Sequence, residues 1–447
     1  MMSPSQQSDY LFLRVRRLAS LQSAWNNVKV RAKSSRNLKT RAAAAKFEIN
    51  ELRNLRRLQD ALRSFTFKFE KQRGVLKGRG PDRPPRPIVT APLPNRIVQR
   101  AILDVCQDSD PKIAPMLGAI PQILRTPTSV GGIPEKGATD AIAAIMSAVQ
   151  SGARYYIRSD IKDFFTRIPK QQILNFLVLN IPDPEFVSIF MTALQVELEN
   201  VEEIREWSNL FPTGEIGVPQ GSSLSALCAN IILERFDIEL NGRGITTIRY
   251  LDDFVILGPA ENSVTKAWQK ALQILDALEM KAHSPSERSG KAAKGLISDG
   301  FDFLSFRITD IHVAPSRNAK KEFIRDLEQT IYLAKKDIQA QTTSPRRAEN
   351  RFGQSMVLID RKVRGWGDSF RATTQRLVFA QLDQEVSKMI DEYWNWFSVQ
   401  IATVIGYERR RKLGIAVLSD CPLPEVVEEN PTEIGKLANR TSMRRVA

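Results

Sequence analysis

The residues best suited to chemistry in this chain are two adjacent carboxylates, Asp252 and Asp253, set between apolar stretches. Ile248 precedes them and the run Phe254 to Leu257 follows them. This pattern predicts two short strands joined by a sharp turn that brings both side chains out at one point. Like charges this close require a cation, and Mg²⁺ is a hard ion that takes oxygen ligands and shares them with substrate phosphates. Taken alone, the string is weak evidence, because most such strings are solvated turns.

A second carboxylate, Asp160, stands at the end of a predicted strand in Ser159-Asp160-Ile161-Lys162-Asp163-Phe164-Phe165. Nucleotidyl transfer uses two divalent ions, one to activate a 3′-hydroxyl and one to hold the triphosphate and the leaving oxygen. Such a reaction needs carboxylates from two separate segments that meet at one place, here Asp160 and Asp252 with Asp253 beside them. It needs no side-chain nucleophile, which suits a chain with only two histidines.

The elements that must position these residues can be read from periodicity and from Gly and Pro. We expect strands at 88–89, 155–160 and 301–306. We expect a Gly/Pro-broken basic loop at 77–87, and a turn at 217–221 that opens a helix reaching Leu233, with Ser222 as its cap. Further helices are expected within 11–69, at 96–105, at 265–278 and from Ser316 to about Tyr407, followed by a loose tail after Cys421.

Composition points to a basic globular protein. The 447 residues can form two or three domains, and the net charge of +15 favours a polyanionic partner, of which nucleic acid is the first candidate. A solubility charge or a membrane-surface patch is the alternative. Between Arg31 and Arg57 there are nine Lys/Arg and two Glu, which favours contact with a phosphate backbone over a solvated helical face.

Several classes of protein are not indicated. No apolar run approaches the roughly 18 residues that cross a bilayer, and the first seven residues lack the layout of a secretion signal. The three cysteines, Cys106, Cys228 and Cys421, lie far apart and suggest neither a disulfide framework nor a zinc site. We therefore expect a cytoplasmic protein that does not bind a membrane.

Together these segments resemble the palm of a reverse transcriptase, most closely the bacterial branch related to group II intron-encoded enzymes. The resemblance extends to Arg86-Pro87-Ile88 and Asn95 to Ala101 in the fingers, Val130 to Thr139 before the first catalytic strand, and Val363 to Phe370 in the thumb. It implies an α+β right-hand polymerase with fingers and palm, built from antiparallel sheet plus helices, and an α-helical thumb. The implied regions are a basic helical N-terminal region (1–75), fingers (76–155), palm (156–312), thumb (313–412) and tail (413–447).

The resemblance also implies a set of site residues. The catalytic residues would be Asp160, Asp252 and Asp253, and the ligands of two Mg²⁺ ions, which Mn²⁺ could replace, would be Asp160, Ile161, Asp252 and Asp253. Substrate would be bound by Phe165, Gln220, Gly221, Arg86 and Lys77.

Two of these roles have a physical rationale. A Phe165 ring against the sugar would clash with a 2′-hydroxyl and select deoxynucleotides, although core packing is its alternative use. Arg86 and Lys77 would hold the incoming triphosphate unless they are only solvated charges. Gln220 and Gly221 would approach the template–nucleotide pair unless they merely open a helix. The family's basic general acid would fall in the segment 281–291, where Arg288 is best aligned.

Among reverse transcriptases, the chain resembles the standalone bacterial enzymes of antiphage defence. It lacks a Cys/His-rich segment after the thumb, and it lacks the Asn-Ala-X-X-His and Val-Thr-Gly strings of retron enzymes. The expected partners are dNTPs, an RNA template that is a dedicated structured noncoding RNA, the DNA product and a second protein of a defence operon. The alternative is an intron-type maturase or retron-like enzyme whose RNA-binding role dominates. The priming group stays open between RNA, DNA and a protein Tyr or Ser. Trp366, Trp394 and Trp396 are expected to pack in a helical core more than to stack on bases.

Overall fold

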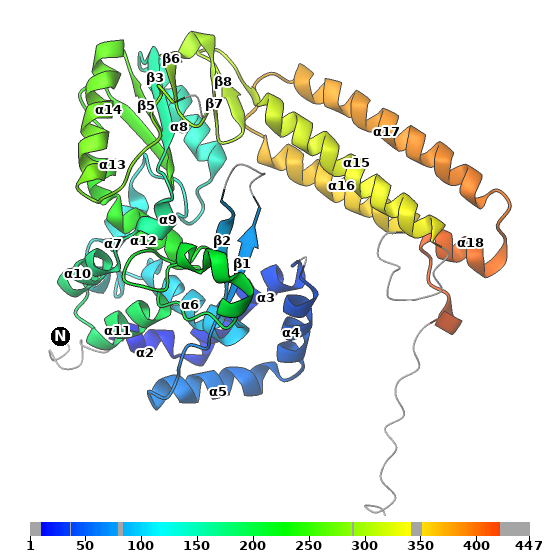
Figure 1. Cartoon of the computed structure of the whole chain (residues 1–447), viewed down its shortest axis with the longest axis horizontal. Coiled ribbons are helices and arrows are strands. Elements are labelled where there is room, and N and C mark those ends of the chain that lie inside the picture. The colour runs from blue at the N-terminus through cyan, green and yellow to red at the C-terminus, as the bar shows by residue number, and fades with distance from the viewer. Residues whose placement is uncertain (1–9, 36, 79–83, 288–289, 341–350, 421–447) are drawn as a thin grey trace, which may run out of the picture. The chain divides into compact units, whose positions relative to one another are not determined.

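A computed structural model describes residues 10–35, 37–78, 84–287, 290–340 and 351–420 (Figure 1). The chain divides into two compact units. The first comprises Met1–Ser316 with Ser369–Gln375, and the second comprises Arg317–Asp368 with Arg376–Ala447. The expectation of a mixed α and β chain with antiparallel sheets is confirmed.

The N-terminal part of the first unit is helical, as the sequence predicts. Its helices are α2 (Tyr10–Val15), α3 (Leu18–Lys33), α4 (Leu38–Ile49) and α5 (Glu51–Arg63). Helix α3 packs against α6 (Leu93–Cys106) and buries Trp25, whose ring lies 4.5 Å from that of Phe47. The residues from Ser64 to Phe69, which the expected helical stretch included, lie outside any helix.

A two-stranded hairpin follows, made of β1 (Arg73–Lys77) and β2 (Arg86–Thr90). The expectation of a loop from Lys77 to Pro87 is wrong at its ends, because Lys77 pairs with Arg86 and Leu76 with Pro87. Both strands of such a sheet are edges, so a proline that lacks an N–H is tolerated there. Residues 79–83 of the expected loop lie outside the described residues.

The sheet that carries the acidic residues has the strand order β4-β5-β3-β6 and is antiparallel throughout. Its strands are β3 (Tyr155–Asp160), β4 (Thr246–Tyr250), β5 (Asp253–Gly258) and β6 (Ala293–Leu296). Helix α14 (Glu261–Asp276) packs on β3 and β5, and α8 (Ala138–Gln150) packs on β4 and β5 (Figure 1). The predicted strand before Asp160, the two strands around the Asp pair and the amphipathic helix are thereby confirmed.

The helix expected from residue 219 onward begins later. Helix α12 spans Ser225–Ile232, and the Ser222 hydroxyl accepts a bond from Leu224 N instead of capping the helix. The preceding backbone is committed elsewhere, since Val218 N donates to Phe165 O and Gln220 O accepts from Val89 N. These tertiary bonds hold the segment extended and delay the start of the helix.

The single strand expected at 301–306 is instead a hairpin. Strands β7 (Phe301–Phe303), β8 (Phe306–Ile308) and β9 (Val313–Pro315) form a second antiparallel sheet. Leu304 and Ser305 form the turn, with φ of 48° and 70°. The interval from Phe303 to Phe306 is three residues, which breaks the two-residue alternation of a strand. The remaining helices of the first unit include α7 (Ile120–Arg125), α9 (Phe164–Arg167), α10 (Lys170–Asn180), α11 (Pro184–Ala193) and α13 (Glu234–Glu239).

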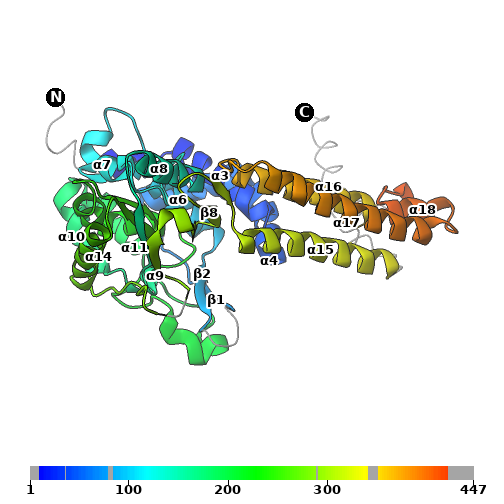
Figure 2. The same ribbon diagram turned by 90° about the horizontal axis from the view of Figure 1, so that it is seen from above.

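The second unit is helical, with α15 (Arg317–Gln339), α16 (Phe352–Ser369), α17 (Leu377–Ile401) and α18 (Gly406–Leu413) (Figure 2). Its core contains Trp366, which stacks on Phe323, and Trp396, which packs beside Tyr393. Core packing is confirmed for these two tryptophans. It is wrong for Trp394, which is 53% exposed. The expected helical stretch agrees with these helices, apart from residues 341–350 and the tail after Cys421, which lie outside the described residues.

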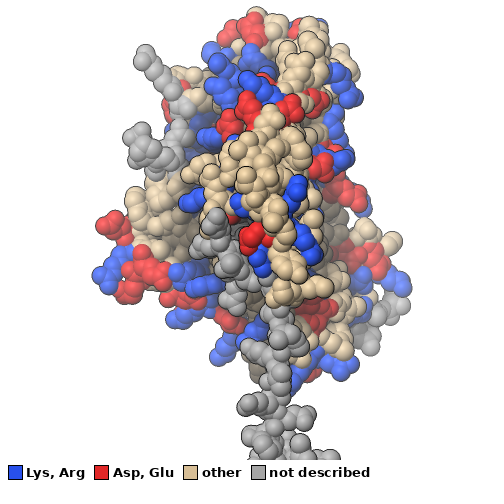
Figure 3. All heavy atoms as spheres, turned by 90° about the vertical axis from the view of Figure 1, so that its right-hand side faces the viewer, with Lys and Arg blue, Asp and Glu red and all other residues tan. Residues whose placement is uncertain are grey.

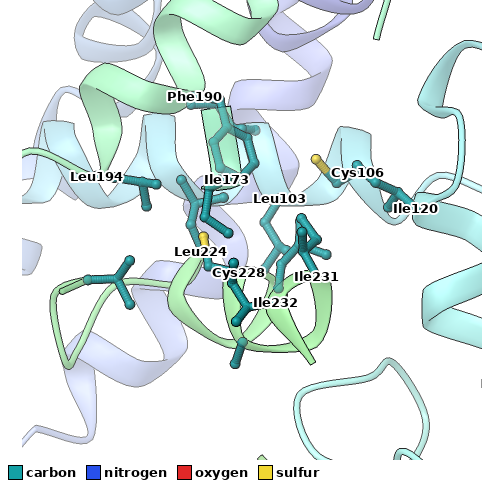
Figure 4. Packing of buried hydrophobic residues seen from close by; sticks show 14 of the residues in the cluster. Leu103, Cys106, Ile120, Ile173, Phe190, Leu194, Leu224, Cys228, Ile231 and Ile232 are labelled. Atoms are coloured by element: carbon teal, nitrogen blue, oxygen red, sulfur yellow. The ribbon is translucent and has the colours of Figure 1, made fainter. Parts of the chain in front are cut away.

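Two of the three cysteines lie in the main core of the first unit (Figure 4). Cys106 and Cys228 are buried free thiols among aliphatic side chains such as Leu103, Leu224 and Ile231. Burial raises the pKa of both thiols, that of Cys228 to about 12. They therefore behave as apolar packing groups. Cys421 lies outside the described residues.

The surface mixes charges of both signs. On the face drawn in Figure 3, basic and acidic side chains are interspersed among the described residues. No helix in the described ranges is both long enough and apolar enough to span a bilayer.

Candidate active site

The structure brings Asp160, Asp252 and Asp253 together, and we call these three residues the aspartate cluster. Asp160 at the end of β3 lies directly opposite Asp253 at the start of β5 in the strand register. Asp252 is in the two-residue loop between β4 and β5, where Tyr250 pairs with Asp253. Carboxylates from two segments about 90 residues apart in sequence thus meet at one edge of the sheet, as the sequence predicts.

The loop that carries Asp252 has an uncommon backbone. Its first residue, Leu251, has φ of +58°. Tight hairpin loops require a positive φ, which Gly or Asn normally supplies. Leucine rarely adopts a positive φ. It keeps this conformation only where the surrounding contacts hold it there.

Backbone hydrogen bonds fix the segment that follows Asp160. Ile161 N donates to Asp252 O at 3.0 Å, so the predicted ligand Ile161 adjoins the loop through its main chain. Lys162 N donates to Lys281 O at 2.7 Å, and His283 N donates to Asp160 O at 3.0 Å. Because its side chain is a buried hydrocarbon, Ile161 could offer a metal ion only its carbonyl oxygen.

The electrostatics of the cluster disfavour three bare negative charges. Desolvation and then the neighbouring Asp160 raise the pKa of Asp252. The pKa of Asp253 is raised by desolvation and by the charges of Asp252 and Asp160. Asp253 is exposed to solvent, which weakens desolvation. We therefore attribute the raised pKa of Asp253 mainly to repulsion by Asp252 and Asp160.

Two residues near Asp160 were not singled out from the sequence. The Lys291 ammonium lies 2.5 Å from Asp160 Oδ2. His283 Nε2 lies 3.9 Å from Asp160 Oδ1, beyond hydrogen-bond distance, while Nδ1 contacts Glu287 at 3.0 Å. Arg288, the residue best aligned with the family's general acid, lies outside the described residues. The expected segment therefore does supply a basic group, but at Lys291.

The cluster fits a divalent cation by its chemistry. Asp160 Oδ1 is buried and has no hydrogen-bond partner, and its two acidic neighbours both have raised pKa values. Among the described residues, no three His, Cys, Asp or Glu side chains are already arranged as a metal cluster. Lys291 neutralises part of the negative charge of the aspartate cluster. Carboxylate oxygens are the ligands that Mg²⁺ and Mn²⁺ prefer, and Asp160, Asp252 and Asp253 would supply them.

The two basic residues expected in the fingers are neighbours. Lys77 and Arg86 are paired in register at the loop end of the β1–β2 hairpin, and both are exposed. Arg86 is close enough to Asp252 to lower its pKa. The structure therefore brings Arg86 near the aspartate cluster.

Phe164 and Phe165 differ in burial. Phe164 is 2% exposed and belongs to the core, as expected. Phe165 is only partly buried and packs against that core, so one part of its ring remains accessible. Its backbone carbonyl accepts a bond from Val218 N.

The segment of Gln220 and Gly221 contacts the β1–β2 hairpin. Gly221 has φ of +123°, and a Cβ there would lie 2.5 Å from Val89 O. This close approach to β2 explains the requirement for glycine. Gln220 is partly exposed.

A comparison with protein families decides the identity of this fold. The family model described as reverse transcriptase (RNA-dependent DNA polymerase) matches residues 80–306, just over half of the 447 residues. The chain belongs to the reverse transcriptase family. This matched region of the reverse transcriptase contains all three residues of the aspartate cluster.

Other similarities are partial. An uncharacterized 91 kDa protein in a cob intron of Schizosaccharomyces pombe is 30% identical over 122 residues, which are 27% of this chain and 14% of that protein. Two solved structures, a partial Cas6-RT-Cas1–Cas2 complex and a Cas6-RT-Cas1–Cas2 complex, are 21% identical with a TM-score of 0.33. Each match covers 60% of this chain, and it covers 43% and 27% of the respective other chain. This reverse transcriptase therefore spans less than half of each of these relatives.

Proposed function

We propose that this protein is an RNA-directed DNA polymerase that adds dNTPs to a 3′-hydroxyl by two-metal nucleotidyl transfer. The observation that carries the proposal is the meeting of Asp160, Asp252 and Asp253 at one edge of the palm sheet in a member of the reverse transcriptase family. Two divalent ions bound there would stabilise the charge that develops on the attacking and leaving oxygens.

The residues of the chain would share the remaining work. Arg86, already close to Asp252, would neutralise triphosphate oxygens from the fingers with Lys77 beside it. Phe165 would stand against the sugar and exclude a 2′-hydroxyl. Lys291 would neutralise Asp160 until ions bind, and would then be free to act on a substrate phosphate. We propose the boundaries given above for fingers, palm and thumb as the corresponding domains.

Primer extension on an RNA template with purified protein, Mg²⁺ and dNTPs tests this function. We expect product from the wild type, and a loss of about 1000-fold or more in Asp252→Asn, because a metal ligand supplies several kcal/mol of transition-state stabilisation. Asp276→Asn, an exposed carboxylate on α14, is the matched control and should leave the rate unchanged. Absence of product from the wild type, or full activity in Asp252→Asn, would refute the proposal.

We further propose that the template is a dedicated structured noncoding RNA and that the protein serves in antiphage defence, with a partner protein from the same operon. A groove of about 590 Å³ at the junction of α4 and α5 supports RNA binding. Arg53, Arg56 and Arg57 line it together with the exposed Ile49 and Leu52. A row of exposed arginines suits contacts with a phosphate backbone.

Ion pairs engage two lysines of the basic N-terminal region. Lys29 contacts Glu48 and Glu51, and Lys33 contacts Glu48, so the lysines of α3 are engaged within the protein. Arg53, Arg56 and Arg57 remain exposed on α5. We therefore propose the arginines of α5 as phosphate contacts in preference to Lys29 and Lys33.

Sequencing the nucleic acid that copurifies from the native host tests the template. One enriched structured RNA that yields complementary DNA would support the defence proposal. Enrichment of an intron RNA would instead favour the maturase alternative, which the similarity to a protein in a cob intron keeps open.

A triple substitution on α5 tests whether its arginines bind RNA. Arg53, Arg56 and Arg57 changed together to Gln should weaken RNA binding and lower the slope of log K against log salt by about 2–3. The same change at Arg235, Lys266 and Lys270, exposed on α13 and α14, is the control and should leave the slope unchanged.

A further inference from the structure

The loop that carries Asp252 is held by a buried arginine next to it in sequence. Arg249 on β4 is fully buried, at 0% exposed. Its Nε donates to Asp237 Oδ1 at 2.7 Å, and its Nη2 contacts Asp237 Oδ2 as well. Its Nη1 donates to Leu251 O at 3.0 Å. One side chain thereby ties the loop to helix α13.

The same guanidinium reaches the segment that precedes α8. Nη2 donates to Ser129 Oγ at 2.9 Å and to Asn230 Oδ1 at 3.0 Å. The Asn230 amide in turn donates to Gly131 O at 3.1 Å. Main-chain hydrogen bonds also join β4 to the segment before α8, since Arg249 N donates to Thr128 O and Val130 N donates to Arg249 O.

Gly131 also contacts the loop. A Cβ at Gly131 would lie 2.5 Å from Leu251 N and 2.8 Å from Tyr250 C. The backbones of residues 131 and 251 are therefore in direct contact, and only glycine permits it. The loop thus contacts both this backbone and the guanidinium that binds its carbonyl.

These contacts explain how a leucine keeps a positive φ. The conformation of Leu251 costs free energy, and the Arg249 bond to its carbonyl together with the packing of Gly131 selects it over the alternatives. A change in the Leu251 peptide would redirect the Asp252 carboxylate. A side chain that acts on a metal site through the backbone of a ligand belongs to its outer shell.

We propose that Arg249 is a positioning residue that, together with the segment from Ser129 to Gly131, fixes the direction of the Asp252 and Asp253 carboxylates for divalent-ion binding. The inference rests on the proposed polymerase function. Arginine is required because one planar group must serve an acceptor pair on α13 and a carbonyl in the loop at the same time. A lysine carries the same charge but has a single donor nitrogen.

Arg249→Lys tests the proposal, with Mn²⁺ binding measured by the loss of the free-ion electron paramagnetic resonance signal. We expect the Mn²⁺ dissociation constant to rise at least about 10-fold and kcat to fall about 100-fold, while KM for dNTP stays within a factor of two. A folded Arg249→Lys that binds Mn²⁺ as the wild type does would overturn the proposal. A wild type that neither extends primers nor binds Mn²⁺ would instead overturn the proposed function itself.

Gly131→Ala keeps the test decisive if Arg249→Lys does not fold. The added methyl group would displace the Leu251 backbone and leave every bond donor of Arg249 in place, so Mn²⁺ binding should weaken in the same way. Gly137→Ala, in the same segment, is the matched control because a Cβ there meets nothing within 4 Å. If Gly131→Ala and Gly137→Ala bind Mn²⁺ equally well, the proposal fails.

Discussion

Two carboxylate–cation pairs in the first unit differ in almost every respect. Asp237 and Arg249 are buried, at 3% and 0% side-chain exposure, and every nitrogen of the guanidinium has an acceptor. Asp160 and Lys291 are more open, at 14% and 32%, and one oxygen of Asp160 has no hydrogen-bond partner. The first pair is saturated and the second is not.

The difference separates a structural pair from a reactive one. A buried pair in which every guanidinium nitrogen has an acceptor cannot exchange partners without a large loss, so it serves as a fixed support. A half-satisfied carboxylate beside two like charges gains from any incoming cation. We therefore expect chemistry at Asp160 and structural support at Asp237. The bond from Arg249 to Leu251 O connects the supporting pair to the loop of the aspartate cluster.

The largest effect that would break this comparison concerns catalysis. Asp160→Asn should reduce primer extension by about 1000-fold or more with little change in the melting temperature, since it removes a metal ligand and one of three repelling charges. Rates and thermal melting measured on the same preparation would check it. A stable, fully active Asp160→Asn protein would place the chemistry elsewhere.

The next effect concerns stability. Asp237→Ala should lower the free energy of unfolding by about 3–5 kcal/mol, because it leaves the Arg249 charge buried and unpaired. Asp302→Ala is the control, since its pair with Arg307 at 3.6 Å is about half exposed and should contribute less than about 1 kcal/mol. Urea unfolding measures both, and equal losses would contradict the distinction.

A smaller effect concerns Lys291. Lys291→Met should enlarge the rise in melting temperature that Mg²⁺ causes, because the metal-free protein loses its neutralising cation and the ion no longer competes with it. Lys294→Met, three residues away and paired at 3.4 Å with Glu261, should respond to Mg²⁺ as the wild type does. The comparison of melting curves with and without Mg²⁺ decides it.

The smallest effect sharpens the account of the buried network. Ser129→Ala removes one acceptor from Arg249 Nη2, which keeps Asn230 and Asp237, and should cost about 1 kcal/mol. Ser284→Ala, a hydroxyl at the surface, should cost nothing measurable by the same urea titration. A loss at Ser129 as large as that for Asp237→Ala would show that the bonds of Arg249 act as one unit.

Local pattern was sufficient for the strands that carry the aspartates. Apolar runs on either side of Asp252-Asp253, and an apolar run that ends at Asp160, predict strands whose ends meet, and the structure confirms the strands and their pairing. The pattern gave wrong predictions where the spacing between two residues, or a hydrogen bond to a distant residue, decided the local structure. Phe303 and Phe306 differ from strand spacing by one residue, and the helix after Gly221 starts late because Val89 binds the preceding backbone.

The sequence also contained a signal that was not used. Arg249 stands between Ile248 and Tyr250, next to the Asp pair. A charge at such a position is either solvated or paired in the core, and pattern alone does not separate the two. The structure shows that Arg249 is paired in the core, because its guanidinium binds partners on α12, α13 and the segment before α8.

By itself the sequence determined that acidic groups from two segments stand at strand ends, because residue type and two-residue periodicity are local properties. Only the tertiary structure decided which cation lies against Asp160, which side chain binds Leu251 O, and why residues 131 and 221 must be glycine. Those contacts join residues from 89 to 291, and their distances depend on how the whole unit packs, which no local pattern encodes.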